Sequence, residues 1–147
     1  NKFKGLKFRN QIIYKKNNLL IINDSKSTTF SSTVGLLYSY SNIFWIVGGK
    51  YKKGDKLNLK RKYPKNIKAY IIGTNRKFFT NQLKDKIESR YFGSLNKAIL
   101  TIKKEIKNDF NKKTILFSPS AASFDQFKNF EERGRYFNKL VKKIFRG

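Results

Sequence analysis

The chain lacks three residue types, two of which carry much of the chemistry of enzymes. Its 147 residues include no cysteine, no histidine and no methionine. Without cysteine it can form no disulfide and offers no thiolate nucleophile. Without histidine it lacks a main zinc ligand and the commonest general base. These absences exclude thiolate and histidine catalysis by this chain alone.

Long apolar runs are absent as well. No stretch reaches the roughly 18 apolar residues that a membrane helix needs, and the first residues show no signal-peptide pattern. Hydrophobic residues still make up 39% of the chain. That content suits one domain with a real core and is too high for a disordered tail. Because the sequence begins at Asn1 and holds no methionine, we expect it to be part of a longer protein.

Acidic residues are scarce, with nine against 34 basic residues and a net charge of +25. Such an excess is typical of proteins that bind nucleic acid. However, 27 of the basic residues are lysines spread along the whole length, whereas recognition of bases and phosphates favours arginine. Lysine, asparagine and isoleucine share A/T-rich codons, so genome composition also explains the bias. A stand-alone nucleic-acid-binding module is therefore the alternative, not the preferred interpretation.

Short apolar runs alternate with amphipathic segments along the chain. Strands are expected near residues 9–14, 19–23, 43–47, 69–72, 87–91 and 114–117, and helices near 30–40 and 75–83. Two further helices show apolar stripes at helical spacing: Leu95, Ala98, Ile99, Ile102, Ile106 and Phe110 in one, and Tyr136, Phe137, Leu140, Val141, Ile144 and Phe145 in the other. The alternation predicts an α/β fold with an open, mostly parallel sheet, helices on both faces and a short N-terminal hairpin.

Small and polar residues follow each central strand of the predicted sheet. They are Asn23-Asp24-Ser25-Lys26, Gly48-Gly49, Gly73-Thr74-Asn75 and Ser118-Pro119-Ser120. Open parallel sheets bind ligands at the carboxyl ends of their strands. The pattern as a whole, more than any single residue, predicts a site at that edge.

The first two of these segments also have a purely structural explanation. Asp24 could accept hydrogen bonds from a ribose and Lys26 could face a phosphate. However, Asp, Ser and Thr are also the usual helix caps, and spacing alone leaves the two possibilities equally open. The loop at residues 48–55 is glycine-rich and basic but lacks the order of a P-loop. Spacing alone favours an ordinary exposed loop there.

The stretch at residues 118–134 is the most informative part of the chain because it is polar and aromatic and follows a buried strand. Ser123 and the backbone amides near Phe124 and Phe130 could bind a carboxylate. Phe124, Phe127 and Phe130 recur every three residues, so they could instead form an aromatic helix face packed on the sheet. The two possibilities are compatible, with the aromatic rings buried and the polar groups exposed.

These segments, in this order, resemble the C-terminal domain of the Mur ligases. Three blocks carry the resemblance: Asn23-Asp24-Ser25-Lys26 with Thr28, Gly48-Gly49 followed by Lys52, and Ser118-Pro119 running through Ala122-Ser123 and Asp125-Gln126-Phe127-Lys128-Asn129-Phe130-Glu131 to Arg133-Gly134. Gly5-Leu6 followed by Arg9 is similar to the motif that opens the domain in this family. The resemblance covers nearly all of residues 1–147 and is greatest for members that act on D-glutamate.

The resemblance implies a Rossmann-like domain of a ligase in bacterial peptidoglycan synthesis. In the family, ATP phosphorylates the carboxylate of UDP-N-acetylmuramoyl-L-alanine with release of ADP, and the amine of D-glutamate attacks the acyl phosphate, which forms the amide and releases phosphate. Positioning of the amine then contributes much of the rate, and Mg²⁺ offsets phosphate charge. We expect ATP, Mg²⁺ and the UDP group to be bound mainly by upstream domains that this chain lacks. The chain alone should therefore be inactive, and the whole enzyme cytoplasmic and monomeric.

Carried over by position, the resemblance implies two sets of ligand contacts. D-glutamate would be held by Thr28, Lys52, Ser123, Phe124 and Phe130, and the nucleotide by Arg9, Asp24 and Lys26. Lys7 and Phe8 stand where the family has proline and histidine, which affects the nucleotide side most. A related ligase that extends folates with glutamate is a second alternative.

Overall fold

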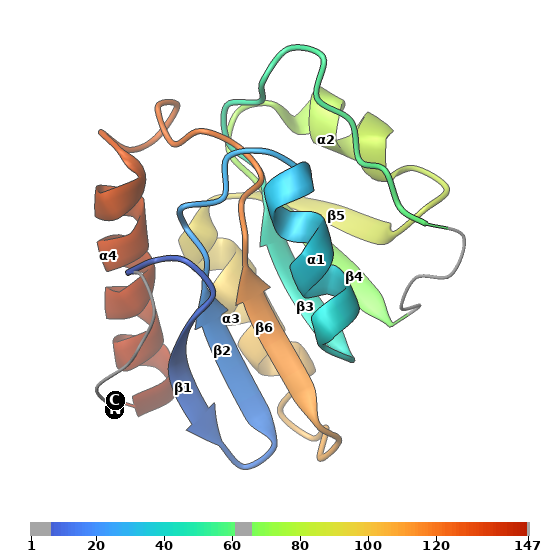
Figure 1. Ribbon diagram of the computed structural model, residues 1–147. Coiled ribbons are helices and arrows are strands. Elements are labelled where there is room, and N and C mark those ends of the chain that lie inside the picture. Colours follow the sequence, from blue (N-terminus) through green and yellow to red (C-terminus); the bar gives the residue numbers. More distant parts are fainter. Residues whose placement is uncertain (1–6, 61–65, 147) are drawn as a thin grey trace.

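The computed structural model describes residues 7–60 and 66–146. Its centre is a six-stranded sheet in the order β1-β2-β6-β3-β4-β5 (Figure 1). The strands are β1 (Gln11–Lys16), β2 (Leu19–Asn23), β3 (Ile43–Val47), β4 (Ile67–Ile72), β5 (Glu88–Gly93) and β6 (Lys113–Phe117). Only the β1–β2 pair is antiparallel. The open, mostly parallel sheet with its N-terminal hairpin is confirmed.

Helices cover both faces of the sheet (Figure 1). The helices α1 (Ser31–Ser39) and α2 (Arg76–Leu83) bury their apolar residues on one face, and α3 (Leu95–Glu105) and α4 (Phe130–Val141) on the other. Successive residues of β3 alternate between the two cores: Trp45 packs with α1 and α2, and Ile46 with α3 and α4. This alternation follows from the period of two in a strand, and it confirms the Rossmann-like, three-layer arrangement.

The opening hairpin is tighter than the sequence suggested. β1 continues to Lys16, which pairs with Leu19, and the turn consists of Asn17 and Asn18 at φ 49° and 69°. Both residues adopt the left-handed conformation that two-residue hairpins need and that asparagine tolerates. Lys15 and Lys16 resemble turn residues in the sequence, but they fit this outer strand because their side chains reach solvent.

Two residues of the predicted helical stripes are exposed, and Ile144 and Phe145 are half-buried. Helix α3 follows its N-cap, Ser94, whose hydroxyl accepts a hydrogen bond from the Lys97 amide at 3.2 Å. The helix ends at Glu105, so Phe110 lies beyond it and is 82% exposed. In α4, Tyr136 also points outward, whereas Phe137 packs against β6. The stripes therefore identified the two helices correctly, but each included one exposed residue, and the second continued into the π-helical turn Lys142–Arg146 that follows α4.

Candidate ligand site at the carboxyl edge of the sheet

Three connections that are far apart in the sequence meet where the parallel strands end. In Figure 1, the connection from β6 to α4 runs along this edge beside the connection from β2 to α1. The amide of Gly48 donates to the carbonyl of Pro119 at 2.9 Å, and Lys50 and Ala122 exchange two backbone hydrogen bonds at 2.9 Å each. The segments after β2, β3 and β6, each singled out in the sequence, thus form one surface.

The glycine pair after β3 allows the connections to approach each other closely. Gly48 has φ 129°, and a Cβ there would lie 2.1 Å from the carbonyl oxygen of Ile72. A Cβ on Gly49 would lie 2.7 Å from the carbonyl oxygen of Ala122. Both contacts are shorter than real Cβ atoms tolerate, so the glycines are required by backbone packing. This part of the loop is therefore not the plain exposed loop that its spacing favoured.

A buried chain of hydroxyl groups joins the connections after β2 and β6. Ser118 donates its hydroxyl to the Asp24 carboxylate at 2.6 Å, and it also hydrogen-bonds with the hydroxyl of Thr33. Thr33 in turn hydrogen-bonds with the hydroxyls of Ser27 and Ser120 at 2.6 and 2.7 Å. Among the described residues no buried side-chain polar atom lacks a partner. These linked hydroxyl groups therefore hold the connections after β2 and β6 together as one hydrogen-bonded network.

Asp24 is the acidic end of that network. Its carboxylate also accepts a hydrogen bond from the Asn10 amide at 2.9 Å. Burial raises the pKa of Asp24 above its ordinary value, although the hydrogen bonds and the charges of Arg9 and Arg133 act in the opposite direction. Arg9 is exposed beside it. Asp24 thus binds mainly to the protein itself, although it caps no helix because α1 has no side-chain cap, while Arg9 remains accessible.

Lys26, the third nucleotide candidate, lies over an aromatic ring. Its ammonium is 4.5 Å from the ring centroid of Phe130, a cation–π geometry. The Lys26 amide donates to the carbonyl of Phe8 at 2.9 Å. The ring of Phe8 is buried against Gly134, where a Cβ would lie only 2.5 Å away. Phe8, which stands where the family has histidine, is therefore a packing residue in this protein.

Ser123 presents the most suggestive polar group on the D-glutamate side. The residue is only 3% exposed, but its hydroxyl makes no hydrogen bond to any described residue and is not among the buried polar atoms, so it reaches the surface. The Ser123 carbonyl accepts the amides of Gln126 and Phe127 at 3.1 and 2.8 Å. The amide of the following residue, Phe124, likewise has no acceptor in residues 7–60 and 66–146. A fixed hydroxyl and a neighbouring amide are groups that can bind a carboxylate.

The phenylalanines of this segment do not form the packed helix face that their spacing allowed. Residues 121–129 are irregular, and the ring of Phe124 is 70% exposed. Phe127 instead lies 5.5 Å from the ring of Tyr136. Phe130 is the first residue of α4, and its carbonyl accepts the hydroxyl of Ser25 at 2.8 Å. An exposed ring beside free polar groups is available to a ligand.

The remaining two candidates are exposed and contact none of the other predicted residues. Thr28 precedes α1, and Lys52 lies in the basic loop, where its carbonyl accepts the Asp55 amide at 3.0 Å. The same loop borders a hollow of about 410 Å³ at this edge, lined by Lys50, Tyr51, Lys53, Thr74, Asn75, Phe124 and Asp125. The hollow brings Lys50 and Lys53 beside Phe124, whereas the resemblance implied Lys52.

Arg133 is a central residue of this edge that the sequence did not assign to the site. The side chain is 1% exposed, and its guanidinium donates to the Ser25 hydroxyl at 3.0 Å, the Ser25 carbonyl at 2.5 Å and the Ala121 carbonyl at 2.9 Å. Burial lowers the pKa of Arg133 to about 10, and the charges of Asp125 and Asp24 oppose that shift. Its spacing from Phe137 and Leu140 places it on the buried stripe of α4, which is a signal that could have revealed it.

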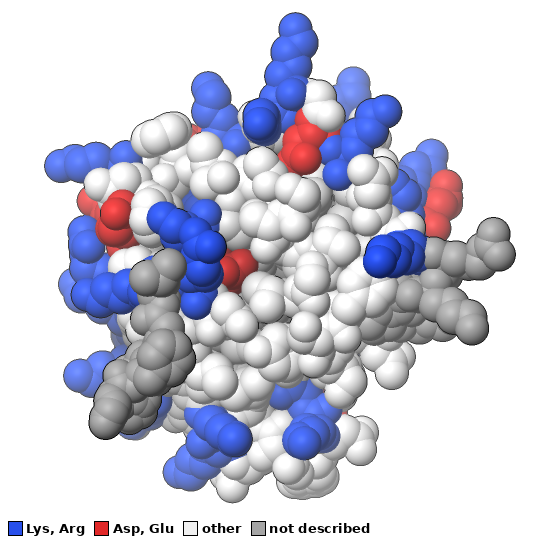
Figure 2. All heavy atoms as spheres, viewed as in Figure 1, with Lys and Arg blue, Asp and Glu red and all other residues white. Residues whose placement is uncertain are grey.

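The surface charge does not form a single basic patch. Figure 2 shows Lys and Arg side chains projecting around the whole outline, while the centre of this face, over α1 and β6 in Figure 1, is mostly uncharged. A groove for a nucleic acid backbone would gather those charges along one track. The visible face therefore gives the nucleic-acid alternative no support.

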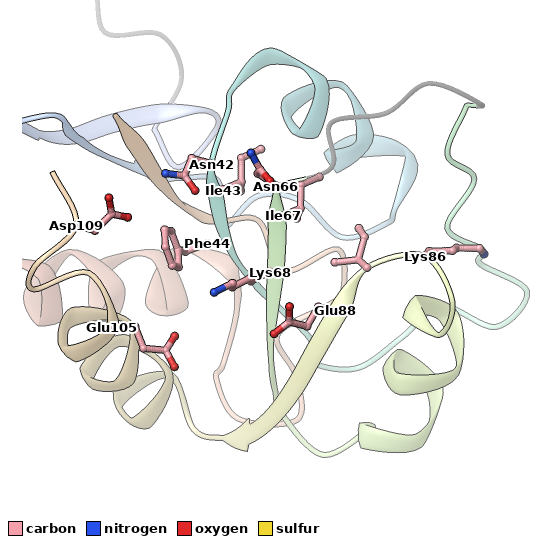
Figure 3. A pocket seen from close by; sticks show the side chains of 11 residues that line it. Asn42, Ile43, Phe44, Asn66, Ile67, Lys68, Lys86, Glu88, Glu105 and Asp109 are labelled. Atoms are coloured by element: carbon pink, nitrogen blue, oxygen red, sulfur yellow. The ribbon is translucent and has the colours of Figure 1, made fainter. Parts of the chain in front are cut away.

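A second hollow lies at the opposite edge of the sheet, where β3, β4 and β5 begin. It has a volume of about 290 Å³. Figure 3 shows Lys68, Glu88 and Glu105 around it, with Asp109 at one end. Its three carboxylates are a third of all acidic residues in the chain. This edge is thus less favourable for an anion than the carboxyl edge.

Neither a metal site nor a membrane span is found in the described part of the chain. No three carboxylates in residues 7–60 and 66–146 converge as ligands, so these residues do not by themselves fit a bound Mg²⁺. None of the helices described is long and apolar enough to cross a bilayer. Gly5 and Leu6, part of the weaker motif, lie outside the described residues.

The fold and its polar edge define the class of the protein: a Rossmann-like α/β domain with a candidate ligand site at its strand ends. No protein-family model matches the chain. It is 39% identical over 142 residues to the UDP-N-acetylmuramoylalanine–D-glutamate ligase of Wolbachia sp. subsp. Brugia malayi (strain TRS), covering 97% of this chain and 28% of that protein. The ligase of the same name from Nitrobacter hamburgensis is 37% identical over 143 residues, covering 97% and 31%.

A third relative of that name, from Rickettsia felis, is 37% identical over 142 residues, covering 96% of this chain and 32% of that protein. The chain thus spans less than a third of the length of these curated relatives. It belongs to the Mur ligase family, as a counterpart of the C-terminal portion of the ligases named for D-glutamate.

Proposed function

We propose that this chain is the D-glutamate-binding domain of an ATP-dependent ligase that joins D-glutamate to UDP-N-acetylmuramoyl-L-alanine. The observation that carries the proposal is the pair of unpartnered groups at the carboxyl edge, the Ser123 hydroxyl and the Phe124 amide. They lie on the segment with the longest motif of the family, and relatives over nearly the whole chain are named for this reaction. In this proposal, residues 1–147 together form a single D-glutamate-binding domain.

In the proposed site, different residues bind the different charged groups of D-glutamate. D-glutamate carries two carboxylates, and the Lys52 ammonium with the Thr28 hydroxyl would bind one of them. The Ser123 hydroxyl and the amides of Phe124 and Phe130 would bind the other, through charge-assisted hydrogen bonds. The unprotonated amine between them would be held for attack on the acyl phosphate, which turns a two-body encounter into a positioned reaction.

The nucleotide and the metal belong mainly to other parts of the proposed ligase. Arg9, which is exposed, would meet an ATP phosphate, and Lys26, whose amide donates to the carbonyl of Phe8, would supply a second charge. Asp24 would act through its network because its own oxygens are already hydrogen-bonded. Mg²⁺, when bound elsewhere in the enzyme, would neutralise phosphate charge. We place the active enzyme in the bacterial cytoplasm as a monomer.

The proposal is tested with the full-length protein that carries this chain. We expect ADP release only when ATP, UDP-N-acetylmuramoyl-L-alanine and D-glutamate are all supplied, and none from the 147-residue chain alone. L-glutamate with a folate acceptor is the matched control, because turnover with that pair would indicate a folate-extending ligase. Binding of the chain to DNA at micromolar affinity and physiological salt, with a steep salt dependence, would instead support the nucleic-acid alternative.

A further inference from the structure

Arg133 joins the two halves of the proposed site through the backbone. Two of its guanidinium nitrogens reach Ser25, in the connection that carries Asp24 and Lys26, and the third reaches the carbonyl of Ala121, two residues before Ser123. The Ser25 hydroxyl also donates to the carbonyl of Phe130. One side chain therefore fixes the nucleotide-side connection, the D-glutamate-side connection and the start of α4 relative to one another.

The contacts of Arg133 are unusual for a buried cation. Within residues 7–60 and 66–146 the salt bridge between Arg90 and Glu105 is the only one, so Arg133 is held by neutral oxygens instead of a carboxylate. Burying a cation without an ion pair is costly unless its N–H groups are satisfied. Arginine can satisfy them because its planar fork donates in several fixed directions at once, which lysine cannot do.

We propose that Arg133 is a positioning residue that holds the Ala121–Phe124 segment in register with the Asp24–Lys26 turn, so that D-glutamate and the nucleotide side meet in one geometry. This proposed role of Arg133 rests on the function proposed above. Arg133 is buried and touches no substrate in this role. It acts through Ser25 and Ala121, whose positions determine where the Ser123 hydroxyl and the Phe124 amide point.

The kinetic test compares Arg133→Lys with Arg135→Lys in the full-length ligase. Arg135 lies on the same helix but is exposed, so its variant controls for the loss of a guanidinium from α4. We expect Arg133→Lys to raise the KM for D-glutamate roughly tenfold and to lower kcat, since hydrogen bonds from a charged donor are lost, and Arg135→Lys to change neither. A fall in kcat with KM unchanged would mean only that less enzyme is folded, and would overturn the proposal.

Hydrogen exchange gives a second readout that needs no substrate. The amides of Gln126 and Phe127 are hydrogen-bonded to the Ser123 carbonyl, so a loosened segment should exchange faster at these two positions in Arg133→Lys and more mildly in Ser25→Ala. Unchanged exchange there in both variants would overturn the proposal. If the wild-type ligase showed no turnover with D-glutamate, the proposed function would fail while the exchange result still decided the role of Arg133.

Discussion

The two edges of the sheet differ in chemistry although the same parallel strands form both. At the carboxyl edge, glycines, hydroxyls and backbone amides gather with lysines and the buried Arg133. At the amino edge, the hollow of Figure 3 contains Glu88, Glu105 and Asp109 together with Lys68 and Lys86. Because the three carboxylates outnumber the two lysines there, an anion is attracted more strongly to the first set, and the difference indicates which end can accept a dicarboxylate.

The largest effect should come from Gly48, which brings the carboxyl-edge connections together. We expect Gly48→Ala to destabilise the domain by more than about 3 kcal/mol, because the new Cβ would meet the Ile72 carbonyl and the residue has positive φ. Gly54→Ala is the control, since Gly54 also has positive φ but has open space around it. Its cost should be about 1 kcal/mol. Equal urea midpoints for the two variants would show that the close approach is unimportant.

Removing the Lys52 ammonium should weaken D-glutamate binding at the carboxyl edge. We expect Lys52→Ala to raise the KM for D-glutamate about tenfold or more in the full-length ligase, the effect of losing one charged hydrogen bond. Lys104→Ala is the control because Lys104 is an exposed lysine in the last turn of α3. Should Lys50→Ala or Lys53→Ala raise KM while Lys52→Ala does not, the hollow would replace Lys52 as the carboxylate contact.

The raised pKa of Asp24 predicts a pH dependence of stability. A carboxyl group with a raised pKa in the folded state contributes stability that is present below its unfolded pKa and lost as pH rises through the folded value. The unfolding free energy of the wild type relative to Asp24→Asn should therefore fall as pH rises from acid toward neutral. Asp85→Asn, at an exposed position, should give no such trend. A difference that grows with pH would contradict the burial of a costly carboxylate.

The amino edge should respond least. Glu105 forms a salt bridge with Arg90 at 2.5 Å and accepts a hydrogen bond from Tyr70, but both charged side chains are partly exposed. Solvent screening limits such pairs, so Glu105→Gln should cost less than about 1 kcal/mol in a urea titration. It should also leave the KM for D-glutamate unchanged, and a tenfold rise would show that the two edges are not separate.

The sequence predicted those features that depend on local patterns. The strands at residues 19–23 and 43–47 have the bounds predicted, because short apolar runs that end at polar or glycine residues favour buried strands. Phe110 was misplaced because the turn residues Asn108 and Asp109 follow the end of α3, which the apolar spacing does not reveal. Local pattern thus fixes the elements more reliably than their ends.

The site was less predictable because it depends on contacts between distant segments. That small residues collect at the strand ends could be seen directly, and the topology brings these ends together. The pairing of Lys50 with Ala122 and the fork of Arg133 toward Ser25 join residues that are far apart in the chain. No periodicity marks such pairs. The role of the individual D-glutamate candidates stays a prediction.

Hydrogen exchange of the full-length ligase, with and without D-glutamate, tests the contrast between the edges most directly. The account predicts that D-glutamate, added with the nucleotide substrate and an inert ATP analogue, slows exchange in residues 48–55 and 118–131 at the carboxyl edge. Exchange in residues 66–68, 86–88 and 105–109 at the amino edge should stay the same. Protection confined to the amino edge, or equal at both, would contradict the assignment of D-glutamate to the carboxyl ends of the strands.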